Sequence, residues 1–167
     1  MREVRREKIE VHVGVICFRL SSVGELDVLV GRRAETKELY PGYWDTGGGA
    51  LNEGEDFRDA AERKLSEEFS VQAKILEPVS DFRIPLEGDS QLIIPGVKFI
   101  CLFERYTRGD EPVIQSEDFS EVRWQPINAL DELELIPGEP TDAQQDILAA
   151  AALFLQPEPG DEPRESA

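Results

Sequence analysis

Hydrophobic residues recur at every second position in several short segments of this chain. The first segment, 11–20, carries valine at 11, 13 and 15, a period typical of a strand with one face in the core. A turn at 21–24 leads into a similar segment, 25–33, so the two predict a hairpin. Further strands are expected over 71–84, 98–106 and 121–127. Hydrophobic residues occupy both alternating sets of positions in 98–106, which predicts a strand buried on both faces.

Two other segments have the period of an amphipathic helix. The first, 55–69, places hydrophobic residues on one side, namely Phe57, Ala60, Ala61 and Leu65. Asp59, Arg63 and Glu67 are spaced four apart, as are Lys64 and Glu68, so ion pairs along the helix are expected. The second helix, 141–155, is predicted to begin with a capping box formed by Thr141 and Gln144.

The length and composition indicate one folded domain, 1–156. The chain has 167 residues, of which 40% are hydrophobic and 32% charged, and these are globular values. The end of the chain, 157–167, is rich in proline and acid and is predicted to be a disordered tail. No apolar run approaches the roughly 20 residues that span a bilayer, and the N-terminus lacks the apolar core of a secretory signal.

The charge and the cysteines limit the partners and the compartment. A net charge of −17 repels nucleic-acid backbones and anionic membranes, so we expect neither as a partner. Cys17 and Cys101 lie within apolar strands and are expected to be buried thiols. So few cysteines, without a signal peptide, predict a cytoplasmic protein. The oligomeric state is left open, although strands near the N-terminus would allow a homodimer.

Basic residues and glycines gather before the first predicted helix. Arg32, Arg33 and Lys37 could bind the phosphate oxygens of a ligand, or they could pair with nearby acids such as Glu35 and Glu38; both interpretations stay open. The run Gly47, Gly48 and Gly49 is unsuited to the interior of a helix or strand. It predicts positive φ angles or a close approach of the backbone to another group.

The helix that follows the glycines could hold a divalent cation. Mg²⁺ prefers one or two carboxylates together with water and substrate oxygens. Glu67 and Glu68 are neighbouring carboxylates on a rigid helix beside a glycine-rich loop. Such a site would suit cleavage of a diphosphate, which needs charge neutralisation and fixed geometry. An acidic helix can equally be a solvated surface.

The stretch from Gly49 to Val71 resembles the Nudix box, G-x5-E-x7-R-E-U-x-E-E-x-G-U, in which U is a bulky aliphatic residue. The matching positions are Gly49, Glu55, Arg63, Leu65, Glu67, Glu68 and Val71. The preceding run, PGYWDTGG, is similar to the family's lead-in, with Gly47 where proline is more usual. The order of the predicted elements also agrees with the family along most of the chain.

The resemblance implies an α/β (α+β) fold, with a mixed β-sheet between helices in an α/β/α sandwich. It also implies Mg²⁺- or Mn²⁺-dependent cleavage of a nucleoside diphosphate derivative, a small-molecule substrate. Glu67 and Glu68 would bind the metal, and Glu55 and Arg63 would orient the site. The candidate substrate-binding residues are Arg32, Arg33, Gly48 and Gly49. The candidates for an extra metal ligand or general base are Glu117 and Glu121.

Two residues depart from the family pattern. Ser70 replaces the second glycine of the box, just past the helix, where a left-handed conformation favours glycine. Lys64 replaces the glutamate that follows the arginine, and so puts a positive charge where a cation should bind. Three interpretations therefore remain: a metal-dependent pyrophosphohydrolase, a catalytically impaired Nudix domain that binds a nucleotide or phosphorylated metabolite, or a relative of isopentenyl-diphosphate isomerase.

Overall fold

The computed structural model describes residues 9–85, 93–138 and 141–156. Part of the segment that joins the predicted strands 71–84 and 98–106 lies outside these ranges, and so does the tail predicted over 157–167. Within the described part of the chain, no helix is both long and apolar enough to cross a membrane.

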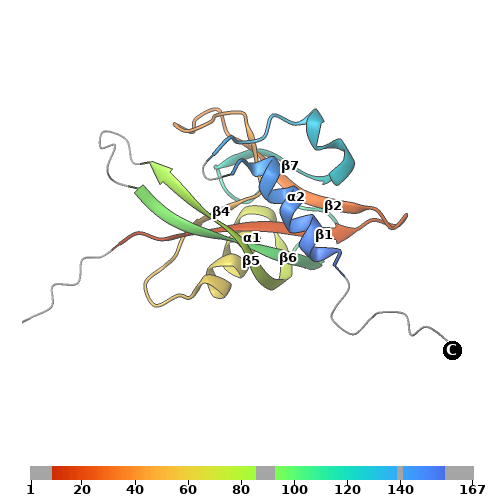
Figure 1. Cartoon of the computed structure of the whole chain (residues 1–167), viewed down its shortest axis with the longest axis horizontal. Helices are drawn as coiled ribbons and strands as arrows, with labels where there is room; N and C mark the ends of the chain where they lie inside the picture. Colours follow the sequence, from red (N-terminus) through yellow and green to blue (C-terminus); the bar gives the residue numbers. More distant parts are fainter. Residues whose placement is uncertain (1–8, 86–92, 139–140, 157–167) are drawn as a thin grey trace, which may run out of the picture.

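One mixed sheet of seven strands organises the molecule (Figure 1). The strands are β1 (His12–Leu20), β2 (Leu26–Arg33), β3 (Trp44–Asp45), β4 (Gly48–Ala50), β5 (Val71–Pro85), β6 (Ile93–Tyr106) and β7 (Phe119–Pro126). The helices are α1 (Phe57–Phe69), the 3-10 helix η1 (Ile127–Glu132) and α2 (Ala143–Phe154). The predicted strands are thus confirmed, with β6 and β7 starting earlier than expected.

Strand β1 lies at the centre of the sheet. The main order is β3-β2-β1-β6-β5, and β4 and β7 pair with β1 and β2. β1 runs parallel to β6 and antiparallel to β2, which confirms the predicted hairpin. The prediction that only one face of this strand is buried was wrong, because Val13–Phe18 are buried at every position. A central strand between two layers of helix has no face left for solvent.

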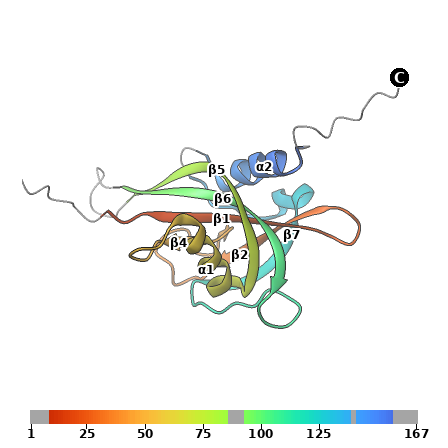
Figure 2. The same cartoon turned by 90° about the horizontal axis from the view of Figure 1, so that it is seen from below.

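The two helices cover opposite faces of the sheet, as Figure 2 shows. On the α1 side, Val15 and Cys17 of β1 pack with Leu65 and Phe69 of the helix. On the α2 side, Ile16 and Phe18 of the same strand pack with Ile147. This arrangement confirms the predicted sandwich of a mixed sheet between helices.

The two cysteines are free and buried, as the sequence predicted, and the structure places them opposite each other on β1 and β6. Burial raises the pKa of the Cys17 thiol and raises that of Cys101 to about 12. Both thiols therefore behave as small hydrophobic groups at neutral pH.

The ends of both helices differ from the sequence prediction. α1 begins at Phe57 rather than Glu55, because Asp56 is the N-cap and its carboxylate accepts the amide hydrogen of Asp59 at 2.9 Å. α2 is capped by Asp142, which accepts from the amide of Gln145 at 2.8 Å. The capping box predicted for Thr141 was therefore wrong. The competing carboxylate lies one residue later and reaches the helix amide directly.

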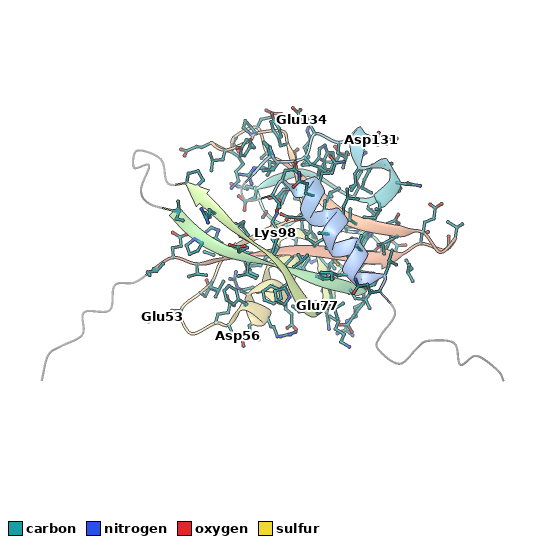
Figure 3. The ribbon with its side chains drawn as sticks, viewed as in Figure 1. Glu53, Asp56, Glu77, Lys98, Asp131 and Glu134 are labelled. Atoms are coloured by element: carbon teal, nitrogen blue, oxygen red, sulfur yellow. The ribbon has the colours of Figure 1, made fainter. Side chains whose placement is uncertain are left out.

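A buried ion pair joins the sheet to α2. Lys98 of β6 lies on the sheet beside α2 (Figure 3), and its Nζ is 2.6 Å from Oδ2 of Asp146. The Asp146 side chain is only 3% exposed, and the hydroxyl of Thr141 donates to its other oxygen. The aliphatic part of Lys98 covers Gly14, where an added Cβ would lie 2.7 Å from its Cγ.

We predict that removing one partner of this pair destabilises the protein. Asp146→Asn leaves the half-buried ammonium group of Lys98 without its counter-charge, and such a loss costs about 3 kcal/mol. The free energy of unfolding, measured in urea, is the readout. The double variant Lys98→Met/Asp146→Leu removes both charges and should recover most of the loss. A loss below about 1 kcal/mol for Asp146→Asn would contradict the assignment.

Candidate functional site

The glycine run brings the backbone before α1 close to the centre of the sheet. Gly47 and Gly48 have φ angles of 97° and 139°, as the sequence predicted. A Cβ on Gly48 would lie 2.2 Å from the carbonyl oxygen of Val13 in β1, so only glycine fits there. β4 can therefore pair directly with β1 while it leads into the loop before α1.

Arg63 ties that loop to the helix. Its Nε and Nη2 donate to the two carboxylate oxygens of Glu55 at 2.9 and 2.8 Å, and Nη2 also donates to the carbonyl of Ala50 at 2.9 Å. The hydrogen bonds from Arg63, and then that from the amide of Asn52, lower the pKa of Glu55 to about 2. Arg63 thus turns away from Asp59, so of the two ion pairs predicted along Asp59, Arg63 and Glu67 only the pair between Arg63 and Glu67 forms.

Glu68 points inward from α1 toward the glycine run. The residue is 3% exposed, and its Oε1 accepts the amide hydrogen of Gly48 at 3.1 Å. Burial raises the pKa of Glu68 to about 8; the nearby charges of Asp45 and Asp118 act in the same direction, and the bond from Gly48 and the charge of Lys64 oppose them. Negative charge is therefore concentrated around one buried carboxyl group.

Lys64 lies among the acids of this site, but it does not form the ion pair expected with Glu68. Its Nζ is 3.7 Å from Oε2 of Glu67, which also accepts from Nη1 of Arg63 at 3.2 Å. The Lys64 side chain covers Gly49, where an added Cβ would lie 2.4 Å from its Cε. Glu68 is unavailable to Lys64 because its side chain turns into the core, whereas Glu67 is exposed.

The basic cluster before α1 pairs with acids, one of the two interpretations left open. Arg32 lies 3.8 Å from Glu35, as that interpretation expected. The other two residues find acids from further along the chain: Arg33 lies 3.7 Å from Asp45, and Lys37 lies 2.6 Å from Asp118. Arg32 stays exposed, with a side-chain exposure of 46%.

Two acids near Glu68 were missed in the sequence. Asp45 directly precedes Thr46 and the glycine run, and Asp118 follows the candidate Glu117. Glu117 itself is exposed, and Glu121 is exposed on β7 opposite Arg32. In the sequence, the acid-rich stretch 117–121 was the feature that pointed to this region. The pairing of β2 with β7 decides which of its carboxylates approaches α1.

The donor chemistry of this site suits a hard dication that keeps other ligands. Within residues 9–85, 93–138 and 141–156, no three side chains of His, Cys, Asp or Glu converge tightly enough to hold a metal by themselves. Glu67 and Glu68 are adjacent, and Asp45 and Asp118 add negative charge around Glu68. Mg²⁺ accepts such a partial set, because it takes its remaining oxygens from water and substrate.

We predict that the stability of the metal-free protein falls as the pH rises from about 4.5 to 8. In this window the folded protein keeps a proton on Glu68, whose pKa is raised to about 8, while the unfolded chain has lost it. Glu68→Gln removes this penalty and should be more stable than the native protein by roughly 2 kcal/mol or more above pH 8, but not near pH 4.5. Urea unfolding with a chelator across this range is the measurement.

The exposed Glu62 on the same helix supplies the matched control, because Glu62→Gln should leave the pH dependence unchanged. Equal pH profiles for the native protein and Glu68→Gln would contradict the inward placement of the carboxyl group.

Comparison with known proteins agrees with this geometry. The NUDIX domain family model matches residues 10–145. An uncharacterized Nudix hydrolase of Pseudomonas aeruginosa is 33% identical over 154 residues, which cover 90% of this chain and 81% of that protein.

Solved structures show the same fold. The NUDIX domain of Shewanella oneidensis NrtR, complexed with ADP ribose, aligns with a TM-score of 0.66 and 20% identity, covering 90% of this chain and 91% of that one. A C. elegans Ap4A hydrolase aligns with a TM-score of 0.65 and 14% identity, covering 87% and 98%. From the matched length, the curated relative and the shared fold, we conclude that this chain belongs to the Nudix hydrolase family.

Proposed function

We propose that the protein hydrolyses the diphosphate linkage of a nucleoside diphosphate derivative with the help of Mg²⁺ or Mn²⁺ held by Glu67 and Glu68. The observation that carries this proposal is the buried Glu68 carboxyl group, fixed by the amide of Gly48 at 3.1 Å beneath a loop that Arg63 clamps to the helix. Groups held in this way need little reorganisation when charge develops in a reaction.

Each residue of the loop and helix would have a separate task. The cation, when bound, would neutralise the diphosphate and activate water. Glu55 and Arg63 hold the loop at a fixed distance from α1, and so keep Glu67 and Glu68 in position. Gly48 and Gly49, the sequence candidates for substrate binding, have no side chains, and this lets the loop pack closely against β1 and against the Lys64 side chain.

A third carboxylate would complete the site. Glu117 and Glu121 were the sequence candidates, and both are exposed. Asp118 is better supported, because its charge reaches Glu68 and its ion pair with Lys37, at 2.6 Å, fixes its position. We therefore assign the extra ligand or base to Asp118.

The substrate class follows from the family and from the charges. Two proteins of similar fold are associated with nucleotide derivatives: the S. oneidensis NUDIX domain is complexed with ADP ribose, and the C. elegans protein is an Ap4A hydrolase. Arg32 on β2 keeps a side-chain exposure of 46% despite its pairing with Glu35, so its guanidinium group would be available to a diphosphate. ADP-ribose and dinucleoside polyphosphates are the first substrates to test.

Lys64 favours a second candidate, a domain that binds such a ligand without cleaving it. Its ammonium group already neutralises Glu67 at 3.7 Å, and its positive charge also acts on Glu55 and Glu68. A fixed cation there would compete with a metal and would itself attract a phosphate group.

A substrate panel separates the two candidates. The panel contains ADP-ribose, nucleotide sugars, dinucleoside polyphosphates, and nucleoside di- and triphosphates, each with Mg²⁺ or Mn²⁺. Product formation that is lost on chelation supports the hydrolase. Calorimetric binding of a nucleotide without any product would support the binding domain instead.

We predict that Glu68→Gln abolishes turnover of any substrate that the panel identifies. The amide keeps the hydrogen bond with Gly48 but cannot supply the negative charge that holds a cation. The rate should fall at least 100-fold, while Glu62→Gln on the exposed side of α1 keeps the native rate. Turnover by Glu68→Gln within tenfold of the native rate would refute the assigned role.

We also predict that Lys64→Glu increases metal affinity at least tenfold and raises turnover. The change removes one positive charge and adds one negative charge, and a unit pair at 4 Å is worth about 4 kcal/mol at an effective dielectric near 20. Lys64→Gln should give an intermediate value, and Lys74→Glu on exposed β5 should have no effect. Unchanged Mn²⁺ affinity, measured by calorimetry, and an unchanged rate would place Lys64 away from the metal.

A further inference from the structure

Tyr40 has a strained backbone conformation, and the packing of its side chain does not explain the strain. Its φ angle is 50°, in the left-handed region that disfavours a bulky side chain. In the described part of the chain, the other non-glycine residue with positive φ is Ser70, which is the C-cap of α1. Tyr40 caps no helix and is 40% exposed, so core packing does not compensate for the strain. Strain of this kind tends to persist at functional sites.

The loop that holds Tyr40 is fastened on both sides by guanidinium groups. Arg33 donates to the carbonyl of Leu39 at 2.9 Å, and Arg32 donates to the carbonyl of Gly42 at 3.1 Å. The amide of Tyr43 donates to the carbonyl of Tyr40 at 3.2 Å. The exposed ring is therefore presented by a backbone that is already ordered.

Tyr43 supports the ring of Tyr40. The ring centroids lie 5.4 Å apart with an interplanar angle of 64°, an edge-to-face contact. The carboxylate of Glu134 raises the pKa of Tyr43; Glu134 lies at the rim of the molecule in Figure 3. Tyr40 therefore packs against Tyr43 and stays partly open to solvent.

This aromatic pair lies in the loop that leads into Asp45 and the glycine run. Tyr43 precedes Asp45 by two residues, so their backbones lie within about 7 Å of each other. Asp45 is paired with Arg33 at 3.7 Å and acts electrostatically on Glu68. The exposed guanidinium of Arg32 lies beside Gly42 in the same loop. The loop thus carries an aromatic face and a guanidinium group a few residues before Asp45.

We propose that Tyr40 is the stacking platform for the nucleobase of the ligand, supported by Tyr43. This inference rests on the proposed function and adds a specificity residue to the same site. Stacking of a base on an aromatic side chain tolerates any base, because every base has a π-face. Tyr40 would therefore select nucleotides over base-free diphosphates without selecting among nucleobases.

The test compares the binding of ADP and of inorganic pyrophosphate, each with Mg²⁺, by calorimetry. Tyr40→Ala should weaken ADP binding roughly 5- to 100-fold and leave pyrophosphate binding unchanged, whereas Tyr40→Phe keeps native affinity for both. Leu39→Ala is the matched control, because Leu39 is also exposed in this loop but offers no aromatic face. Tyr40→Gly separates binding from folding: it should lose ADP affinity while its Tm stays equal to or above the native value, since glycine accepts a positive φ.

Equal ADP affinity for native protein and Tyr40→Ala would overturn the stacking role and leave the proposed function standing. An equal loss for ADP and pyrophosphate would also overturn it, because the residue would then act on the phosphate end. If the native protein bound neither probe nor any member of the substrate panel, the proposed function would be refuted, and the stacking role with it.

Discussion

The contact of Arg63 with the loop before α1 fixes the geometry of the rest of the site. One guanidinium binds both carboxylate oxygens of Glu55, the carbonyl of Ala50 and the carboxylate of Glu67. Arg offers several donors in a rigid plane, so one side chain can hold a loop, a strand end and its own helix together. The glycine run then has a fixed position over α1, and Glu68 can meet the amide of Gly48.

The acidic groups gathered around Glu68 destabilise the folded protein. Glu68 is buried among other acids, and its pKa is raised to about 8. Such a concentration of acidic groups is unfavourable in isolation, and it is typical of a place where a cation or a ligand completes the charge. In this chain Lys64 already supplies one positive charge next to Glu67. Under the proposed function, the competition between this fixed ammonium group and a bound dication would decide between cleavage of the ligand and binding alone.

The sequence predicted where the strands and helices lie better than it predicted which neighbours they contact. Alternation of hydrophobic residues located the long strands, and the spacing of Ala60, Ala61 and Leu65 located α1, because these periods follow from local geometry. The sequence did not show that β1 is central and buried on both faces, nor that Asp56 and Asp142 cap the helices. Neighbouring carboxylates compete for the same helix amides, and small differences in geometry decide between them.

The sequence by itself determined the family, the positions of Glu55, Arg63, Glu67 and Glu68 on one loop and helix, and the need for backbone freedom at Gly47 and Gly48. These features depend on residues close together in the chain. The tertiary structure alone decided that Glu68 turns inward while Lys64 pairs with Glu67, and that Asp45 and Asp118 join the site. The approach of Asp45 and Asp118 depends on the pairing of β2 with β3 and β7, which joins distant parts of the chain, and no local period in a sequence encodes it.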